Sequence, residues 1–138
     1  MNFLASRSVQ LISPLSRKDT DLTATVIICT RNRVALLRKC LEALTVLEPP
    51  ADEILVVDNS AGDRDTELVA REFAVRYIVE PTPGLSRARN RGFAESHTDI
   101  VAYLDDDAVP DKSWLRFILD PFRDARVAVV SGDTLCPE

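Results

Sequence analysis

The stretch Thr-Ala-Thr-Val-Ile-Ile-Cys, residues 23–29, decides the fold class of this chain. Its β-branched and apolar composition is typical of a strand that is buried on both faces of a sheet. Beyond this stretch, apolar strand-like runs alternate with segments whose apolar residues recur at helical spacing. Such alternation is typical of βαβ units, so the sequence predicts an α/β fold with a parallel sheet.

The remaining elements follow from the same patterns. Further strands are predicted at residues 53–57, 75–79, 100–104 and 127–130. Helices are predicted between the strands, one of them near residues 66–73, and the expected N-caps of the others are Asn32, Ser86 and either Asp111 or Ser113. Crossover helices of this kind cover both faces of a sheet, which predicts a Rossmann-like, mostly parallel architecture.

The chain has 138 residues, the usual size of one domain. We assign residues 1–22 to an N-terminal lead segment and residues 23–138 to the domain. The lead lacks the apolar region and cleavage site of a secretory signal. Pro14 interrupts any helical pattern in it, which favours a flexible lead or an edge element over a membrane-surface helix. No apolar stretch approaches the ~20 residues of a transmembrane helix.

Charge and cysteine usage narrow the choice of partners and compartment. The net charge of −5 gives no general basic surface, so nucleic acid is not expected as a partner. The three cysteines, Cys29, Cys40 and Cys136, form no Cys-x-x-Cys pair, which argues against a disulfide framework and a zinc site. We interpret them as reduced thiols of a cytoplasmic protein, with Cys29 and Cys40 as small core residues.

Polar clusters follow three of the predicted strands, at residues 30–33, 58–60 and 105–107. Open parallel sheets bind ligands outside the carboxyl ends of their strands, and right-handed crossovers bring these ends to one edge. We therefore expect Thr30, Asp58 and the aspartates that follow Leu104 to lie close together. Routine helix capping is the alternative for each cluster taken alone.

Asp105, Asp106 and Asp107 are three consecutive carboxylates at the end of a predicted strand. Carboxylates this close repel one another unless a cation or a set of hydrogen-bond donors compensates their charge. Hard oxygen ligands favour Mg2+ or Mn2+, and Mg2+ is usually held by one or two carboxylates together with substrate phosphates. The sequence therefore predicts a Mg2+ or Mn2+ site, with a solvated acidic turn as the alternative.

A nucleoside diphosphate suits this predicted edge, because its phosphates can share a metal and arginines while its base or ribose donates to Asp58. The arginines available for phosphate or base contacts are Arg31, Arg33, Arg87, Arg89 and Arg91. The last three alternate along one predicted helix and cannot share a face. One or two of them are expected to be surface charges that pair with Glu95 or with solvent.

Other classes of site lack their sequence patterns. The chain has no glycine-rich dinucleotide motif, no P-loop and no Gly-x-Ser-x-Gly elbow. His97 is the single histidine and lies in a polar connection, which favours a surface position over a catalytic one. A phosphoacceptor signalling domain would carry an acidic pair after the first strand, where this chain has Thr30 and Arg31.

Four stretches jointly resemble the family 2 glycosyltransferases of the GT-A fold, and their order and spacing match as well: residues 25–33, 53–60, 84–92 and 103–110. The resemblance implies a nucleotide-sugar site in which Thr30 lies against the nucleoside and Asp58 binds the base. Arg89 would approach the base or the phosphate, and Arg31 is a further nucleotide-binding candidate.

The resemblance also assigns roles to the aspartate triplet, which corresponds to the Asp-x-Asp motif of the family. Asp107 would bind the metal with help from Asp105, and Asp106 would lie near the ribose. The implied activity is metal-dependent, inverting transfer of a sugar to an acceptor hydroxyl. The donor is a nucleotide-diphosphate sugar, with a UDP-sugar expected first, and the acceptor is a glycan, a lipid or a small molecule.

One departure from the family bears on catalysis. The family carries its general base well beyond the Asp-x-Asp motif, and Asp133 and Glu138 come too early to match it. No catalytic residue is therefore assigned, and the chain resembles the N-terminal, donor-binding portion of a GT-A sheet that is incomplete at its C-terminus. The alternative is a non-catalytic or partner-dependent fragment, with a partner chain supplying the acceptor half. A cytoplasmic location, or a peripheral one at the inner membrane face, is expected.

Overall fold

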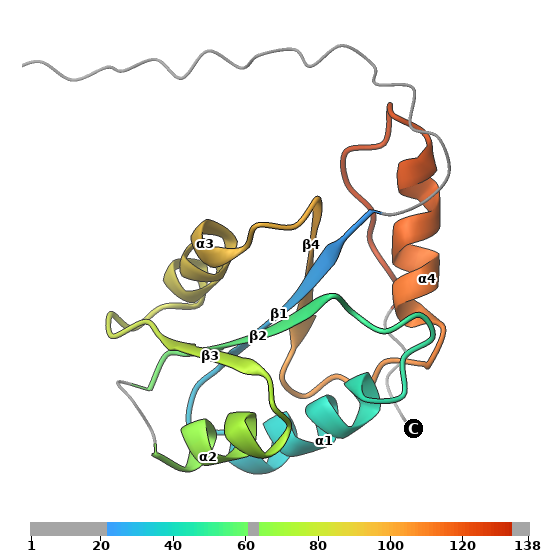
Figure 1. Ribbon diagram of the computed structural model, residues 1–138. Helices are drawn as coiled ribbons and strands as arrows, with labels where there is room; N and C mark the ends of the chain where they lie inside the picture. Colours follow the sequence, from blue (N-terminus) through green and yellow to red (C-terminus); the bar gives the residue numbers. More distant parts are fainter. Residues whose placement is uncertain (1–21, 61–63, 134–138) are drawn as a thin grey trace, which may run out of the picture.

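The structure, a computed structural model, describes residues 22–60 and 64–133. Four parallel strands form one sheet in the order β3-β2-β1-β4 (Figure 1). In chain order the elements are β1 (Ala24–Thr30), α1 (Val34–Leu44), β2 (Glu53–Asp58), α2 (Arg64–Glu72), β3 (Arg76–Val79), α3 (Leu85–Glu95), β4 (Ile100–Asp105), α4 (Trp114–Leu119) and the 3-10 helix η1 (Asp120–Arg123). The predicted α/β class and parallel sheet are confirmed.

β1 lies in the middle of the sheet, with β2 on one side and β4 on the other. Its aliphatic residues are fully buried, as expected for a strand covered on both faces. In Figure 1, α3 lies across the sheet from α1 and α2, so the sheet is the middle one of three layers. The helices therefore cover both faces, as the sequence predicts.

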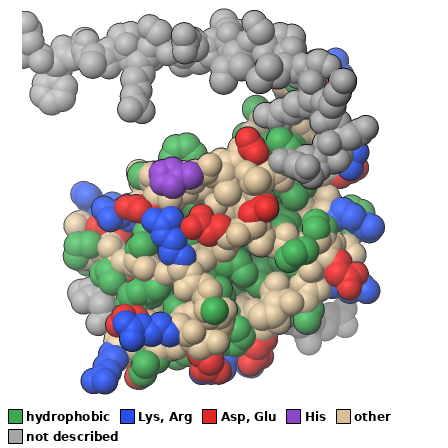
Figure 2. All heavy atoms as spheres, viewed as in Figure 1, with side chains coloured by type: hydrophobic (Ala, Val, Ile, Leu, Met, Phe, Trp, Pro, Cys, Tyr) green, Lys and Arg blue, Asp and Glu red, His purple; other side chains and the backbone are tan. Residues whose placement is uncertain are grey.

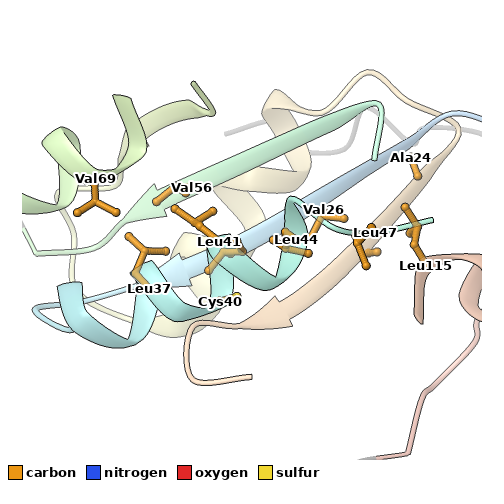
Figure 3. Close-up of a cluster of buried hydrophobic side chains, with 12 residues drawn as sticks. Ala24, Val26, Leu37, Cys40, Leu41, Leu44, Leu47, Val56, Val69 and Leu115 are labelled. Carbon is orange, nitrogen blue, oxygen red and sulfur yellow. The ribbon is translucent and has the colours of Figure 1, made fainter. Parts of the chain in front are cut away.

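Alternation along β1 supplies one side chain to each face in turn. Val26 and Ile28 pack under α1, whose buried residues recur at helical spacing: Leu37, Cys40, Leu41 and Leu44 (Figure 3). Ile27 points to the opposite face and packs with Leu55, Val57 and Ala88 under α3. Two apolar clusters, one on each side, therefore hold the sheet in place.

Gly92 marks the closest approach of α3 to the sheet. A Cβ atom at this position would lie 2.7 Å from Ile27 Cγ2 and 3.2 Å from Val57 Cγ2. Real Cβ atoms do not approach carbon atoms so closely, since the optimal separation is about 3.5–4.0 Å. Only glycine therefore allows α3 to pack against β1 and β2 at this distance.

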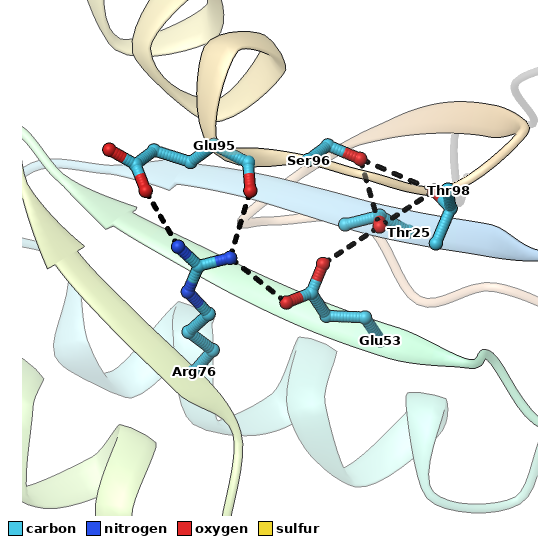
Figure 4. A network of polar contacts seen from close by, with 6 residues as sticks. All are labelled: Thr25, Glu53, Arg76, Glu95, Ser96 and Thr98. Atoms are coloured by element: carbon cyan, nitrogen blue, oxygen red, sulfur yellow. Dashed lines mark hydrogen bonds and ion pairs between the residues drawn. The ribbon is translucent and has the colours of Figure 1, made fainter.

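A polar network joins the amino ends of the strands to the end of α3 (Figure 4). Arg76 donates to Glu53 Oε1 at 3.1 Å and to the Glu95 carbonyl and carboxylate at 2.9 and 2.6 Å. Glu53 Oε2 in turn accepts from Thr25 Oγ1 at 2.8 Å. These bonds satisfy polar groups that are partly or fully buried, and they lie at the edge of the sheet opposite the aspartate triplet.

The predicted strand at residues 127–130 is wrong, because no strand is present there. Val129 is 84% exposed and Val127 and Val130 are only partly covered. A run of valines favours extended backbone, but a strand also needs a neighbour to receive its backbone hydrogen bonds. Within the described residues the outer edge of β4 is unpaired, and residues 127–130 do not pair with it.

Two predicted N-caps are also wrong. Asn32 has a positive φ of 55° and Arg33 takes the N-cap position of α1, without a side-chain cap. Gly84, with a φ of 140°, takes the N-cap position of α3 in place of Ser86. Asparagine and glycine are the residues that tolerate positive φ, so both serve the approach to a helix. Ser113 does stand at the N-cap of α4, and its N–H donates to Asp111 Oδ1 at 2.8 Å.

The remaining predictions concern the surface and the chain ends. No helix in residues 22–60 and 64–133 is long and apolar enough to cross a membrane. The lead segment assigned to residues 1–22 lies almost wholly outside the described residues, as does Cys136. Figure 2 shows acidic and basic side chains interspersed over one face, and His97 is exposed.

Candidate functional site

The carboxyl ends of β1, β2 and β4 bring the three predicted polar clusters together. Thr30 is the register partner of Asp58 on β2, and Cys29 is the partner of Asp105 on β4. Thr30 Oγ1 donates to Asp106 Oδ2 at 2.7 Å, across 76 positions of the sequence. The expectation that Thr30, Asp58 and the triplet share one edge is therefore confirmed.

The three aspartates do not face the same way. Asp106 is fully buried, whereas the side chains of Asp105 and Asp107 are 69% and 55% exposed. Burial raises the pKa of Asp106, and the Thr30 hydrogen bond and the charge of Arg33 oppose that rise. As placed, Asp106 offers no surface to a ribose, while Asp105 and Asp107 present their carboxylates to the outside.

Two arginines compensate the charge of the triplet. Arg33 Nη2 lies 2.7 Å from Asp106 Oδ1, and its Nη1 lies 3.5 Å from Asp107 Oδ2. Arg89 Nη2 lies 3.3 Å from Asp105 Oδ1, and its guanidinium stands over the ring of Tyr103. Arg33 is one of the arginines that the sequence makes available, but no local pattern links it to the triplet, since only the fold brings the start of α1 beside the end of β4.

The other candidate arginines make no ion pair with the triplet within the described residues. Arg31 is exposed and has no ion-pair partner in the part of the chain that the structure describes. Arg91 pairs with Glu95 at 3.0 Å across one helical turn, as predicted for a surface arginine of α3. Arg87 is exposed as well. Arg31, Arg33 and Arg89 are therefore the candidate arginines that remain accessible at this edge.

Asp58 lies at the predicted edge but is fully buried. Its Oδ1 accepts from the N–H and the hydroxyl of Ser60, and its Oδ2 accepts from Tyr77 Oη at 2.7 Å. Tyr77 was not predicted as a site residue, although it lies in the strand that follows Asp58 in the chain. In this conformation Asp58 organises the end of β2 through bonds to the protein itself.

Asn59 fastens the turn between β3 and α3 to the end of β2. Its Nδ2 donates to the carbonyls of Glu80 and Thr82, both at 2.8 Å, and its Oδ1 accepts from Gly84 N at 2.8 Å. Every hydrogen-bonding atom of this buried side chain amide is thus used on residues 80–84. Asn59 belongs to the sequence motif at this edge, and its role in the structure is to shape the loop.

Asn59→Asp is expected to lower the free energy of unfolding by about 2 kcal/mol, because the carboxylate would face two carbonyl oxygens and lose both donors. Urea titration followed by circular dichroism measures the loss. Asn90→Asp on the exposed face of α3 makes the same chemical change and should stay within about 0.5 kcal/mol of wild type. Equal losses in the two variants would contradict the role given to Asn59.

The two outward carboxylates are the oxygen donors that a divalent cation could use at this edge. Within the described residues no three His, Cys, Asp or Glu side chains converge as a complete metal cluster. Mg2+ and Mn2+ do not require one, since one or two carboxylates with ligand phosphates and water complete their coordination. Asp105 and Asp107 are exposed and their ion pairs of 3.3 and 3.5 Å are long, so both can accept a cation. Oxygen donors of this kind match a hard cation.

Two thiols lie beneath the triplet. Cys40 Sγ donates to the carbonyl of Asp105 at 3.7 Å, and Cys29 is the register partner of Asp105. Burial raises the pKa of Cys40 to about 12 and that of Cys29 to about 11, from an ordinary value of 9.0. Cys40 is buried in the core, as predicted, whereas Cys29 is only partly buried and packs against the cluster under α3.

Both thiols are therefore expected to resist alkylation at pH 8 in the folded chain. The thiolate is the reactive form, so iodoacetamide should modify Cys40 roughly a hundredfold more slowly in buffer than in urea. Mass spectrometry of the peptides gives the rate at each cysteine. The raised pKa values also predict that stability is fully present below pH 9 and is lost as the pH rises through about 11 to 12. Equal alkylation rates with and without urea would contradict the expected resistance of the folded chain to alkylation.

Comparison with known proteins shows which family this chain is similar to. The sequence profile of Glycosyl transferase family 2 matches residues 25–136. Glycosyltransferase AglE of Haloferax volcanii is 34% identical over 116 residues, which cover 78% of this chain and 38% of AglE. The probable glycosyltransferase YdaM of Bacillus subtilis is 32% identical over 119 residues, covering 78% of this chain and 28% of YdaM. The chain thus spans well under half the length of these relatives.

Solved structures show the same fold. Glucosyl-3-phosphoglycerate synthase of Mycobacterium tuberculosis, in complex with Mn2+, UDP and glucosyl-3-phosphoglycerate, superposes with a TM-score of 0.63 at 23% identity, over 75% of this chain and 40% of the synthase. The mannosyltransferase PcManGT of Pyrobaculum calidifontis, in complex with GDP-Man and Mn2+, gives a TM-score of 0.60 at 26% identity, over 67% of this chain and 30% of PcManGT. The resemblance seen in the sequence is confirmed. Since the family profile and the relatives span both the parallel sheet and its polar edge, this chain belongs to glycosyltransferase family 2.

Proposed function

We propose that this chain binds a nucleotide-diphosphate sugar at the carboxyl edge of its sheet and takes part in transfer of the sugar to an acceptor hydroxyl. The observation that carries the proposal is the pair of outward carboxylates, Asp105 and Asp107, beside Thr30 and Asp58 in a family 2 chain. Solved relatives hold UDP-Glc or GDP-Man together with Mn2+. A UDP-sugar is the donor we expect first.

Asp105 and Asp107 would hold Mg2+ or Mn2+ against the diphosphate of the donor. Such a cation, when bound, neutralises the charge that develops on the leaving diphosphate. Arg31 and Arg89 would contact the phosphates or the base, since guanidinium groups donate paired hydrogen bonds to phosphate. Thr30 and Asp58 would line the nucleoside side of the site. Asp106 would act on the ribose only indirectly, through its bond to Thr30.

None of these carboxylates is assigned to binding the acceptor or to deprotonating its hydroxyl. Of the acids at the carboxyl ends of the strands, Asp58 and Asp106 are buried, and Asp105 and Asp107 would serve the metal. A general base that deprotonates the acceptor hydroxyl would therefore come from another segment or from a partner chain. This observation favours, as a second candidate function, a donor-binding module that depends on a partner for turnover. Inversion of the anomeric centre would follow from direct attack by the acceptor.

Calorimetric titration of UDP, GDP, UDP-Glc and GDP-Man, each with and without Mn2+, tests the proposal. Binding that requires Mn2+ and favours one base supports it, and a coupled assay for released nucleotide then separates the two candidates. Turnover supports the transferase, whereas binding without turnover supports the partner-dependent module. A folded chain that binds none of the four ligands with Mn2+ present would overturn both.

A further inference from the structure

We propose that Arg33 is the internal counter-cation of the aspartate triplet, and that a divalent metal displaces its guanidinium from Asp107 and turns it toward the diphosphate. This inference rests on the proposed function and adds a residue that couples metal binding to donor binding. It starts from the electrostatics of the triplet. Three adjacent carboxylates need compensation when no metal is bound, and Arg33 contacts two of them.

The two contacts of Arg33 differ in length and in surroundings. The 2.7 Å ion pair is to Asp106, which is fully buried, and the 3.5 Å ion pair is to Asp107, which is half exposed. Attraction between charges is stronger where water is excluded and weak where it is not. Apart from this ion pair, Asp106 Oδ1 has no hydrogen-bond partner in the described part of the chain, so Arg33 is its compensating group. The guanidinium is therefore anchored at Asp106 and loosely held at Asp107.

The backbone of Arg33 allows this exchange without disturbing the fold. Its carbonyl accepts from Leu36 N and Leu37 N, both at 3.0 Å, at the first turn of α1. The Cα is thus fixed by the helix, while the side chain is 49% exposed and can rotate at its outer end. When a cation takes Asp107, Nη1 of Arg33 loses its acceptor. A diphosphate oxygen held on the same cation would provide a new one.

This exchange predicts opposite effects on two affinities in Arg33→Gln. Mn2+ alone should bind about three- to tenfold more tightly, because the competing guanidinium is gone. UDP at saturating Mn2+ should bind about three- to tenfold more weakly, because a phosphate donor is gone. Electron paramagnetic resonance of free Mn2+ measures the first affinity, and calorimetry measures the second. A merely structural role would weaken both affinities together.

The chain offers a matched control. Arg91→Gln removes the same charge from a side chain of similar exposure, 48%, whose 3.0 Å ion pair is with Glu95. Both of its affinities should stay within about twofold of wild type, since surface pairs contribute little. Arg33→Lys retains the charge and should bind Mn2+ like wild type. If Arg33→Gln fails to fold, the double variant Arg33→Gln with Asp106→Asn removes both charges of the buried pair and tests the same exchange at Asp107.

The outcomes separate this inference from the proposed function. Wild type that binds Mn2+ and UDP, with Arg33→Gln tighter for Mn2+ and weaker for UDP, supports the exchange. Mn2+ affinity in Arg33→Gln no tighter than in Arg91→Gln, or an unchanged UDP affinity, overturns the exchange while the nucleotide site stands. Wild type that binds no UDP with Mn2+ overturns both.

Discussion

Asp107→Asn is expected to abolish metal-dependent binding of UDP, with a loss of affinity on the order of a hundredfold or more. The amide keeps the shape of the side chain and removes the negative charge that the cation requires. Because Asp107 is half exposed and only loosely paired with Arg33, its loss should leave the fold intact. Calorimetric titration of UDP in the presence of Mn2+ measures the effect, and circular dichroism verifies folding.

Asp120→Asn is the matched control for this variant. Asp120 is 67% exposed and pairs with Arg123 at 3.0 Å in η1, in another part of the molecule. The change in net charge is the same, so a general electrostatic effect would appear in both variants. UDP affinity should change by less than about twofold in Asp120→Asn. Unchanged, metal-dependent binding of UDP by Asp107→Asn would remove the triplet from the metal site.

Gly92→Ala is expected to lower the free energy of unfolding by about 2 kcal/mol, within the range for overpacked cores. The added methyl would lie 2.7 Å from Ile27 Cγ2, on a β-branched side chain that is fully buried in the central strand. Ile27 is fully buried in the central strand, so its side chain or α3 would have to shift. A shift of α3 would also disturb Arg89 on the same helix. Urea unfolding at equilibrium measures the loss.

Asn90→Ala on the exposed face of α3 is the control for this second variant. It places an alanine in the same helix, at an exposed position. Because alanine has a higher helix propensity than asparagine, this control should be neutral or slightly more stable, by about 0.5 kcal/mol. A Gly92→Ala chain as stable as wild type would show that the gap between α3 and the sheet is wider than the structure indicates.

Much of the fold was accessible from the sequence because its elements repeat simple patterns. The run at residues 23–29 predicted a buried strand, and the helical spacing of Leu37, Leu41 and Leu44 predicted the covered face of α1. The prediction of a fifth strand at residues 127–130 was wrong because a strand depends on more than local composition. Its valines favour extended backbone locally, but a strand exists only where a neighbour accepts its hydrogen bonds. Such a neighbour cannot be read from a local pattern.

The site was predicted in its membership and only partly in its geometry. Parallel connectivity alone brings Thr30, Asp58 and the triplet to one edge, so that grouping followed from the order of elements. The direction of each side chain did not follow. The end of β4 turns Asp106 inward against Thr30, and α1 brings Arg33 onto it. These contacts join segments more than 70 positions apart in the sequence.

The sequence by itself therefore determined the class of this protein, the parallel sheet, the edge that carries the site and the family to which the chain belongs. These properties depend on local periodicity and on the order of motifs, which a linear chain carries in full. The tertiary structure alone decided which aspartate is buried and which arginines compensate the other two. It also decided that the packing of α3 on the sheet requires glycine at position 92. Burial and charge pairing depend on distances between remote segments, and those distances exist only once α1, α3 and β4 have packed around the central strand.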